Sequence, residues 1–127
     1  MRLLPVRRQH AHMSAPVGLS PVESFVLAEA DPEAALWEIT AAWTADGDEA
    51  DRVQAVPLLR EAVIALAGYG FVAVHDFPLR PADWKQEIPV PADGVKAATA
   101  NVQSWLWRPA GSSLLTVSIT DAAVPWL

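Results

Sequence analysis

The chain has 127 residues, of which 52% are hydrophobic, and it carries a formal net charge of −6, six tryptophans and no cysteine. This length predicts one domain, and the apolar content is sufficient for a core. The lack of cysteine excludes disulfides, zinc–thiolate sites and cysteine nucleophiles. The acidic balance disfavours a protein that mainly binds phosphate backbones. No apolar run approaches the roughly 20 residues that span a bilayer, so we expect a cytoplasmic protein without a membrane partner.

Residues 1–18 are predicted to form a basic tail. Arg2, Arg7 and Arg8 lie here, and no acidic residue precedes Glu23. One interpretation is a basic arm that touches nucleic acid or a partner protein. The interpretation we favour is a leader that is either disordered or not translated, with Met1 and Met13 both open as the start. Residues 19–127 are then the folded domain.

Two helices are predicted at the start of this domain. In the first, Ser20 can cap, Pro21 suits the first helical position and Glu23 can close a capping box. The Asp-Pro-Glu run at 31–33 repeats this device and predicts a second helix through about Thr44. Its apolar face is predicted from three residues at helical spacing: Leu36, Ile39 and Trp43.

The segment 46–51 is an acidic connector. A calcium loop is a minor alternative, since the ligand order of an EF-hand is absent. We favour a solvated loop whose last acid, Asp51, caps the next helix. Nine acidic residues and no basic one lie between Glu23 and Asp51, so the first two helices are predicted to form a negative surface.

The segment 57–76 is predicted to be the central helix and strand. The apolar face of this helix comprises Val56, Leu59, Ala62, Val63 and Leu66. Pro57 is predicted to lie in its first turn, where the missing N–H is harmless; a helix beginning near Asp51 would instead be kinked at Pro57. Gly68 and Gly70 are expected to end the helix, and residues 71–75 then form a strand.

The C-terminal third is predicted to contain an irregular segment, a helix and a strand. Residues 77–91 are rich in proline and read as irregular. Residues 95–106 fit a short amphipathic helix with Asp93 as its cap. Residues 114–120 alternate apolar and polar side chains, which is the clearest strand pattern in the chain.

The order of these elements resembles the winged helix-turn-helix family. The run LAGYGFV at 66–72 is similar to the passage from a recognition helix to a wing, and the run LTVSITDAA at 115–123 is similar to the returning wing strand of the MarR-type branch. The chain also resembles small uncharacterised actinobacterial proteins. The resemblance implies an α+β fold: a three-helix winged-helix-like domain with a long, helix-containing insertion, residues 77–113, between the two wing strands. For the regulators of this family, it also implies DNA binding.

The chain departs from this family pattern in two respects. The predicted wing strands are separated by about 37 residues, where a tight hairpin is usual, so the connection is expected to be functional or structured. A recognition helix also needs basic or amide side chains toward the groove. The predicted helix offers only Arg52, Gln54 and Arg60, which Glu49, Asp51 and Glu61 offset.

The catalytic signals are weak, and we predict no catalytic residue, metal site or cofactor. His75 and Asp76 are the one adjacent histidine–acid pair, which suggests a general base or a metal ligand. Neighbouring side chains on a strand face opposite sides, so an ordinary strand histidine is the favoured interpretation. There is no nucleophile elbow and no phosphate-binding glycine motif.

The tryptophans suggest a binding surface. We expect Trp43 and Trp105 in the core. Trp84 and Trp107, beside Lys85 and Arg108 in loop-like sequence, are predicted to contact a partner.

Three functions follow from these observations. The first is a non-enzymatic protein-interaction module, such as an adaptor, an immunity protein or a structural subunit, that uses residues 77–111 and an unidentified protein partner. The second is a winged-helix DNA-binding regulator that could form a homodimer. Here Arg52, Gln54, Arg60 and Arg80 contact DNA along with the basic residues near the tryptophans. The third is a small enzyme that uses His75.

Overall fold

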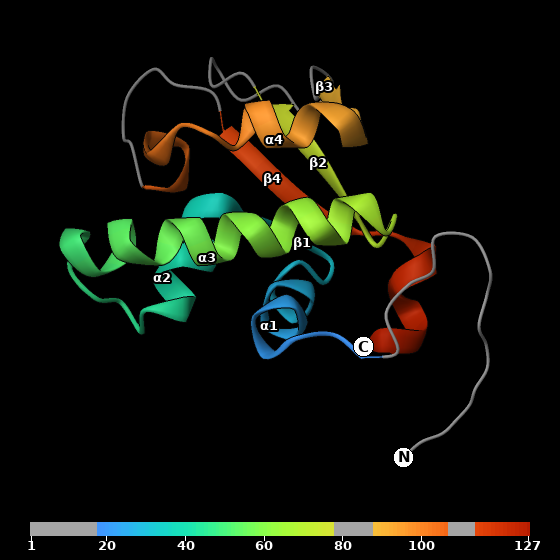
Figure 1. Cartoon of the computed structure of the whole chain (residues 1–127), viewed down its shortest axis with the longest axis horizontal. Coiled ribbons are helices and arrows are strands. Elements are labelled where there is room, and N and C mark those ends of the chain that lie inside the picture. The colour runs from blue at the N-terminus through green and yellow to red at the C-terminus, as the bar shows by residue number, and fades with distance from the viewer. Residues whose placement is uncertain (1–17, 78–87, 107–113) are drawn as a thin grey trace.

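The computed structural model describes residues 18–77, 88–106 and 114–127, and it has an α+β fold, as predicted (Figure 1). The helices are α1 (Pro21–Glu29), α2 (Leu36–Trp43), α3 (Glu49–Gly68) and α4 (Val95–Ala98). The strands are β1 (Glu33–Ala35), β2 (Val72–Phe77), β3 (Ile88–Val90) and β4 (Leu114–Ile119). Three 3-10 turns are η2 (Ala92–Gly94), η3 (Val102–Trp105) and η4 (Asp121–Trp126).

The four strands form one antiparallel sheet with the order β1-β4-β2-β3. Its longest pairing joins β2 to β4, from Val72 opposite Ile119 to Phe77 opposite Leu114. The predicted strand at 71–75 therefore runs two residues further than expected, whereas the alternation at 114–120 located β4 correctly. The short strands β1 and β3 form the two edges of the sheet.

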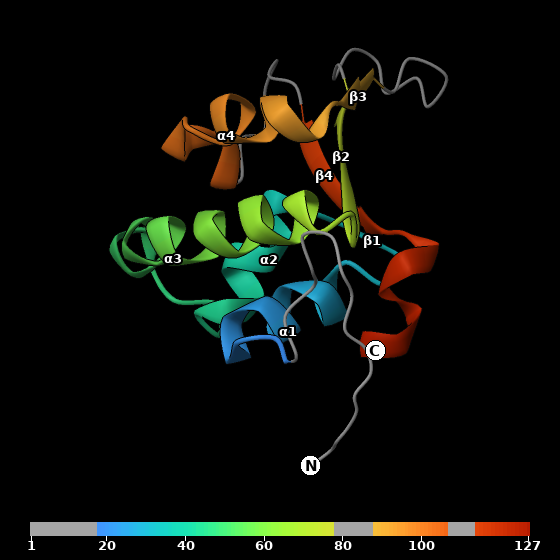
Figure 2. The same ribbon diagram turned by 45° about the vertical axis from the view of Figure 1, so that its right-hand side comes forward.

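Helix α3 organises the core. Figure 2 shows it between α4 and α1, with α2 passing behind it and strands β2 and β4 to its right. The apolar stripe predicted for this helix is buried, and Leu59, Val63 and Leu66 have no exposed surface. Burial of each such side chain contributes about 1.5 to 3 kcal/mol to stability. The remaining core residues come from the other helices and from the sheet. Examples are Leu27 of α1, Ile39 of α2, Val74 of β2 and Val117 of β4.

The start of α1 agrees with its sequence, but the start of α2 does not. At α1, the Ser20 hydroxyl accepts from the N–H of Glu23, and the Glu23 carboxylate accepts from the N–H of Ser20, which completes the capping box. Residues 33–35, predicted as the first turn of the second helix, instead form β1 and pair with β4. The Thr116 hydroxyl donates to the Glu33 carboxylate at 2.9 Å across this pair. Tertiary strand pairing thus overrides the local capping signal.

The prediction that Pro57 lies in the first turn of α3 is wrong. The helix begins eight residues earlier, at Glu49, and runs through the proline. Its N-cap is Asp48, whose carboxylate accepts from the N–H of Asp51, so Asp51 itself is not the cap. The C-terminus of α3 was predicted correctly, because Gly70 adopts a φ of +81°. The N–H of Phe71 donates to the carbonyl of Leu66 there, as in a Schellman motif.

The region between β2 and β4 was predicted with the wrong elements. Residues 88–90 form the edge strand β3, which tolerates Pro89 because an edge residue can lack a paired N–H. The predicted helix at 95–106 is broken into α4 and η3. The break follows Thr99, a fully buried residue whose hydroxyl donates back to the carbonyl of Val95 at 2.8 Å. Asn101 then caps η3 by accepting from the N–H of Gln103.

Several predictions fall outside the described residues, including the basic tail with Arg2, Arg7 and Arg8 and most of the irregular segment at 77–91. Among the described helices, none combines the length and the apolar character needed to cross a bilayer.

Candidate functional site at the α2–α3 corner

The α2–α3 corner, residues 41–52, is a tight turn with unusual backbone geometry. Ala45 and Asp46 have positive φ values of 53° and 61°. The N–H of Asp46 donates to the carbonyl of Ala41 at 2.8 Å, which closes the end of α2. Gly47 is required here by close packing, since a Cβ atom would lie 2.8 Å from a carboxylate oxygen of Asp51 and 3.1 Å from the carbonyl of Thr44.

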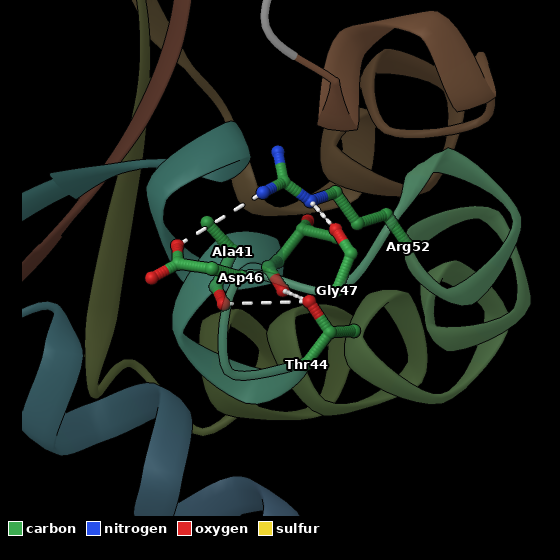
Figure 3. Close-up of polar contacts among 6 residues, drawn as sticks. Ala41, Thr44, Asp46, Gly47 and Arg52 are labelled. Atoms are coloured by element: carbon green, nitrogen blue, oxygen red, sulfur yellow. Dashed lines mark hydrogen bonds and ion pairs between the residues drawn. The ribbon is translucent and has the colours of Figure 1, made fainter.

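Arg52 holds this corner together (Figure 3). Its Nε donates to the carbonyl of Gly47 at 2.8 Å, and its Nη2 lies 3.9 Å from a carboxylate oxygen of Asp46. The Arg52 side chain is 24% exposed, while that of Asp46 is 89% exposed. An ion pair with so exposed a partner contributes little, so the bond to the backbone carbonyl is the main restraint.

Arg60, the second arginine of α3, joins this helix to α4. Its Nη2 donates to the carbonyl of Lys96 at 2.7 Å, and its Nε donates to the Thr99 hydroxyl at 3.3 Å. The carbonyl of Thr99 accepts in turn from the indole N–H of Trp105 at 3.1 Å. The guanidinium therefore binds the C-terminal end of α4, where unpaired carbonyls favour a cation. Both arginines of α3, which were predicted to contact DNA, thus make contacts within the protein.

The outward face of α3 consists of Asp51, Gln54, Leu58 and Glu61, all of them exposed. These positions follow one another at three- and four-residue steps, so they lie on one side of the helix. Gln54 is the one residue of this face that was predicted to contact DNA. The face presents two carboxylates, an amide and a leucine that is 47% exposed, and it presents no cation.

A shallow groove lies between the end of α2 and the start of α3. It has a volume of about 340 Å³ and is lined by Trp43, Thr44, Asp51, Gln54, Ala55 and Leu58. Trp43 is half-buried and packs edge-on against Phe25 of α1, with ring centroids 4.9 Å apart. The groove therefore combines an aromatic ring and an exposed leucine with a carboxylate and an amide.

The residues predicted to bind a partner, namely Trp84, Lys85, Trp107 and Arg108, lie outside the described residues, as does Arg80. They stay predictions. Of the two tryptophans expected in the core, Trp105 is fully buried and Trp43 packs against the core while partly exposed.

His75 and Asp76 lie within β2, further from its end than expected. His75 is opposite Thr116 and Pro89, and Asp76 is opposite Leu115 and Ile88. The two side chains therefore point to opposite faces of the sheet, which separates a histidine base from its adjacent carboxylate. Within the three described ranges, no group of three or more His, Cys, Asp or Glu side chains is placed to hold a metal ion.

The sequence prediction missed the groove residues Trp43, Asp51 and Leu58. One signal was available: Leu58 falls outside the apolar stripe of α3, on the same side as Gln54 and Glu61. A single exposed leucine is ordinary on a protein surface, so this signal becomes specific only beside Trp43, which the fold brings next to it.

Comparison with protein-family models, with curated proteins and with solved structures finds no significant match to this chain.

Proposed function

We propose that this chain is a non-enzymatic protein-interaction module on a winged-helix-like scaffold. The order α1, β1, α2, α3, β2, β4 supports the scaffold, because it places three helices before the two long strands. The pairing of β4 between β1 and β2 supports it as well, since the first strand of a winged helix joins the sheet beside the returning wing strand. The segment that contains β3, α4 and η3 is an insertion into this scaffold.

The observation that carries the proposal is the chemistry of the outward face of α3. A recognition helix reads DNA with basic and amide side chains, and it gains most of its affinity from phosphate contacts. Asp51 and Glu61 on this face would repel phosphates. Arg52 and Arg60 cannot compensate, because each donates to a backbone carbonyl at 2.8 Å or less.

The inserted elements give a second reason to favour a protein partner. Contacts join α3 to η2, α4 and η3, so one flank of the helix is covered. A major groove is about 12 Å wide and takes a helix with a free face along most of its length. The covered flank limits how deeply α3 could enter such a groove, and displacing the insertion would break both Arg60 hydrogen bonds.

DNA binding is the alternative function, and the order of elements favours it. Fluorescence anisotropy of labelled double-stranded DNA of mixed sequence tests both functions. The purified full chain is added at low salt and then with added salt. We expect no change in anisotropy at low salt. Binding that weakens steeply with salt would mean phosphate contacts and would overturn the proposal.

A positive test requires a defined partner. We expect a protein recovered with the full chain from its host to form a stoichiometric complex when both are purified, as measured by isothermal titration calorimetry. If none of the recovered proteins binds the chain when both are purified, the interaction function is contradicted.

A further inference from the structure

The groove at the α2–α3 corner has the composition of a site for a cationic side chain. Trp43 supplies an aromatic face, which attracts ammonium and guanidinium groups. Asp51 supplies a carboxylate, one oxygen of which lies close to Gly47, and Gln54 supplies a side-chain amide. Leu58 lies at the edge with about half of its surface exposed.

We propose that this groove binds a basic amphipathic segment of a partner protein. An arginine or lysine of the segment enters between Trp43 and Asp51, and an apolar residue of the segment covers Leu58. This inference rests on the proposed interaction function and adds to it the site and the chemical class of the partner.

The charges around the groove select a basic occupant. Asp48 at the N-cap and Glu49 at the first position of α3 lie close to Asp51 in the sequence, and both are exposed. Arg52 adds no free cation, since its guanidinium is bound to Gly47 and Asp46. In the described part of the chain, no cation forms an ion pair with Asp51. The C-terminus of α2 and the N-terminus of α3 meet here with opposite partial charges, which largely cancel. The carboxylates therefore determine the sign of the electrostatic potential in the groove.

The same charges disfavour a second copy of the chain as the occupant. A symmetric contact would bring the acidic groups of one groove toward those of the other, in a protein with a net charge of −6. They also disfavour nucleic acid. One basic candidate within this chain is the N-terminal segment with Arg7 and Arg8, which the experiment below distinguishes from a separate partner.

The test is a titration of the full chain, labelled with nitrogen-15, with a synthetic helical peptide. The peptide carries leucines at every third and fourth position and arginines elsewhere; a matched peptide has glutamate in place of arginine. We expect saturable shifts of the Trp43 indole, the Gln54 side-chain amide and the Leu58 amide with the arginine peptide. The glutamate peptide is expected to cause none.

Matched variants locate the binding. Asp51→Asn and Leu58→Ser should each weaken binding of the arginine peptide by about thirtyfold, the smallest loss that defines a hot-spot residue. Asp121→Asn removes a carboxylate and Ile88→Ser removes a four-carbon apolar side chain at exposed positions outside the groove. Both controls should leave the affinity unchanged. Asp51→Lys should reverse the preference toward the glutamate peptide, which a purely structural role of Asp51 would not produce.

Three outcomes would overturn this inference. The first is equal affinity for all variants, or shifts spread over α1 and the sheet rather than the groove. The second is a dimer whose population falls in Leu58→Ser when measured by sedimentation equilibrium. The third is movement of the groove resonances in a peptide-free chain that carries Arg7→Ala and Arg8→Ala. If DNA binding is absent in each case, the interaction function stands and the groove assignment alone fails.

Discussion

The two arginines of α3 stabilise two different regions. At the α2–α3 corner, Arg52 donates to a carbonyl five residues away and faces an exposed carboxylate. At the α3–α4 junction, formed by α3 against residues 95–105, Arg60 contacts residues that are 36 and 39 positions later in the chain. The junction also contains Trp105, whose ring is fully buried and whose N–H is bonded to Thr99.

This difference separates a local restraint from a tertiary one. The corner bonds fix a short turn, which loses little chain entropy when it forms. The junction bonds close a much longer loop, which loses more chain entropy. Burial of side chains and bonds to otherwise unpaired carbonyls must offset this larger loss. We therefore expect substitutions at the junction to lower the free energy of unfolding more than substitutions at the corner.

The largest effect is expected for Trp105→Ala at the junction. Removing a fully buried indole leaves a cavity and an unpaired Thr99 carbonyl, which together cost about 3 to 5 kcal/mol in the free energy of unfolding. Urea unfolding followed by circular dichroism measures this change. The control is Trp126→Ala, a half-buried ring 5.5 Å from that of Phe71, which should cost less. A cost for Trp105→Ala below that of the control would show that η3 does not anchor the insertion.

Arg60→Met is the next largest change. The substitution keeps the apolar stem of the side chain but leaves the Lys96 carbonyl without this donor. We expect the free energy of unfolding to fall by about 1 to 2 kcal/mol, because hydrogen bonds from a charged group on a half-buried side chain contribute that much. Hydrogen exchange of the amides at 95–99 should accelerate in parallel. Lys96→Met alters an exposed side chain of the same helix and should change neither quantity. Unchanged exchange in Arg60→Met would mean that the junction is held by apolar packing alone.

Local signals in the sequence predicted the parts of the fold that depend on neighbouring residues. The capping box at Ser20, the glycine with positive φ at Gly70 and the alternation that identifies β4 are all of this kind. Each relies on contacts within a few residues, or on a periodicity that one segment carries by itself.

The parts that were missed depend on distant partners. The strand β1 exists because residues 33–35 pair with β4, and the Glu33–Thr116 bond spans 83 positions. The helix predicted at 95–106 is interrupted after Thr99, which is buried and accepts a hydrogen bond from Arg60 of α3. The groove has the same origin, since it brings Trp43 of α2 beside Leu58 of α3. The two members of each pair lie in different helices or strands, so the periodicity of one segment does not reveal them.

A smaller effect is expected at the corner for Asp48→Ala. This carboxylate accepts from the N–H of Asp51 at 2.9 Å, and loss of such an N-cap costs about 1 kcal/mol. Asp48→Ser keeps an acceptor and should recover most of the stability, as measured by urea unfolding. If Asp48→Ala cost as much as Trp105→Ala, the corner would be a tertiary restraint, and the distinction between the two regions would fail.

The smallest effect is expected for Asp46→Asn, also at the corner. The substitution removes the carboxylate that lies 3.9 Å from Arg52 but keeps a residue that tolerates positive φ. Because the Asp46 side chain is 89% exposed, we expect a change below about 0.5 kcal/mol and almost no dependence on salt. Arg52→Met should cost more, since it also removes the bond to the Gly47 carbonyl. Equal losses in the two variants, measured by thermal unfolding at low and high salt, would show that the ion pair is the main restraint at the corner.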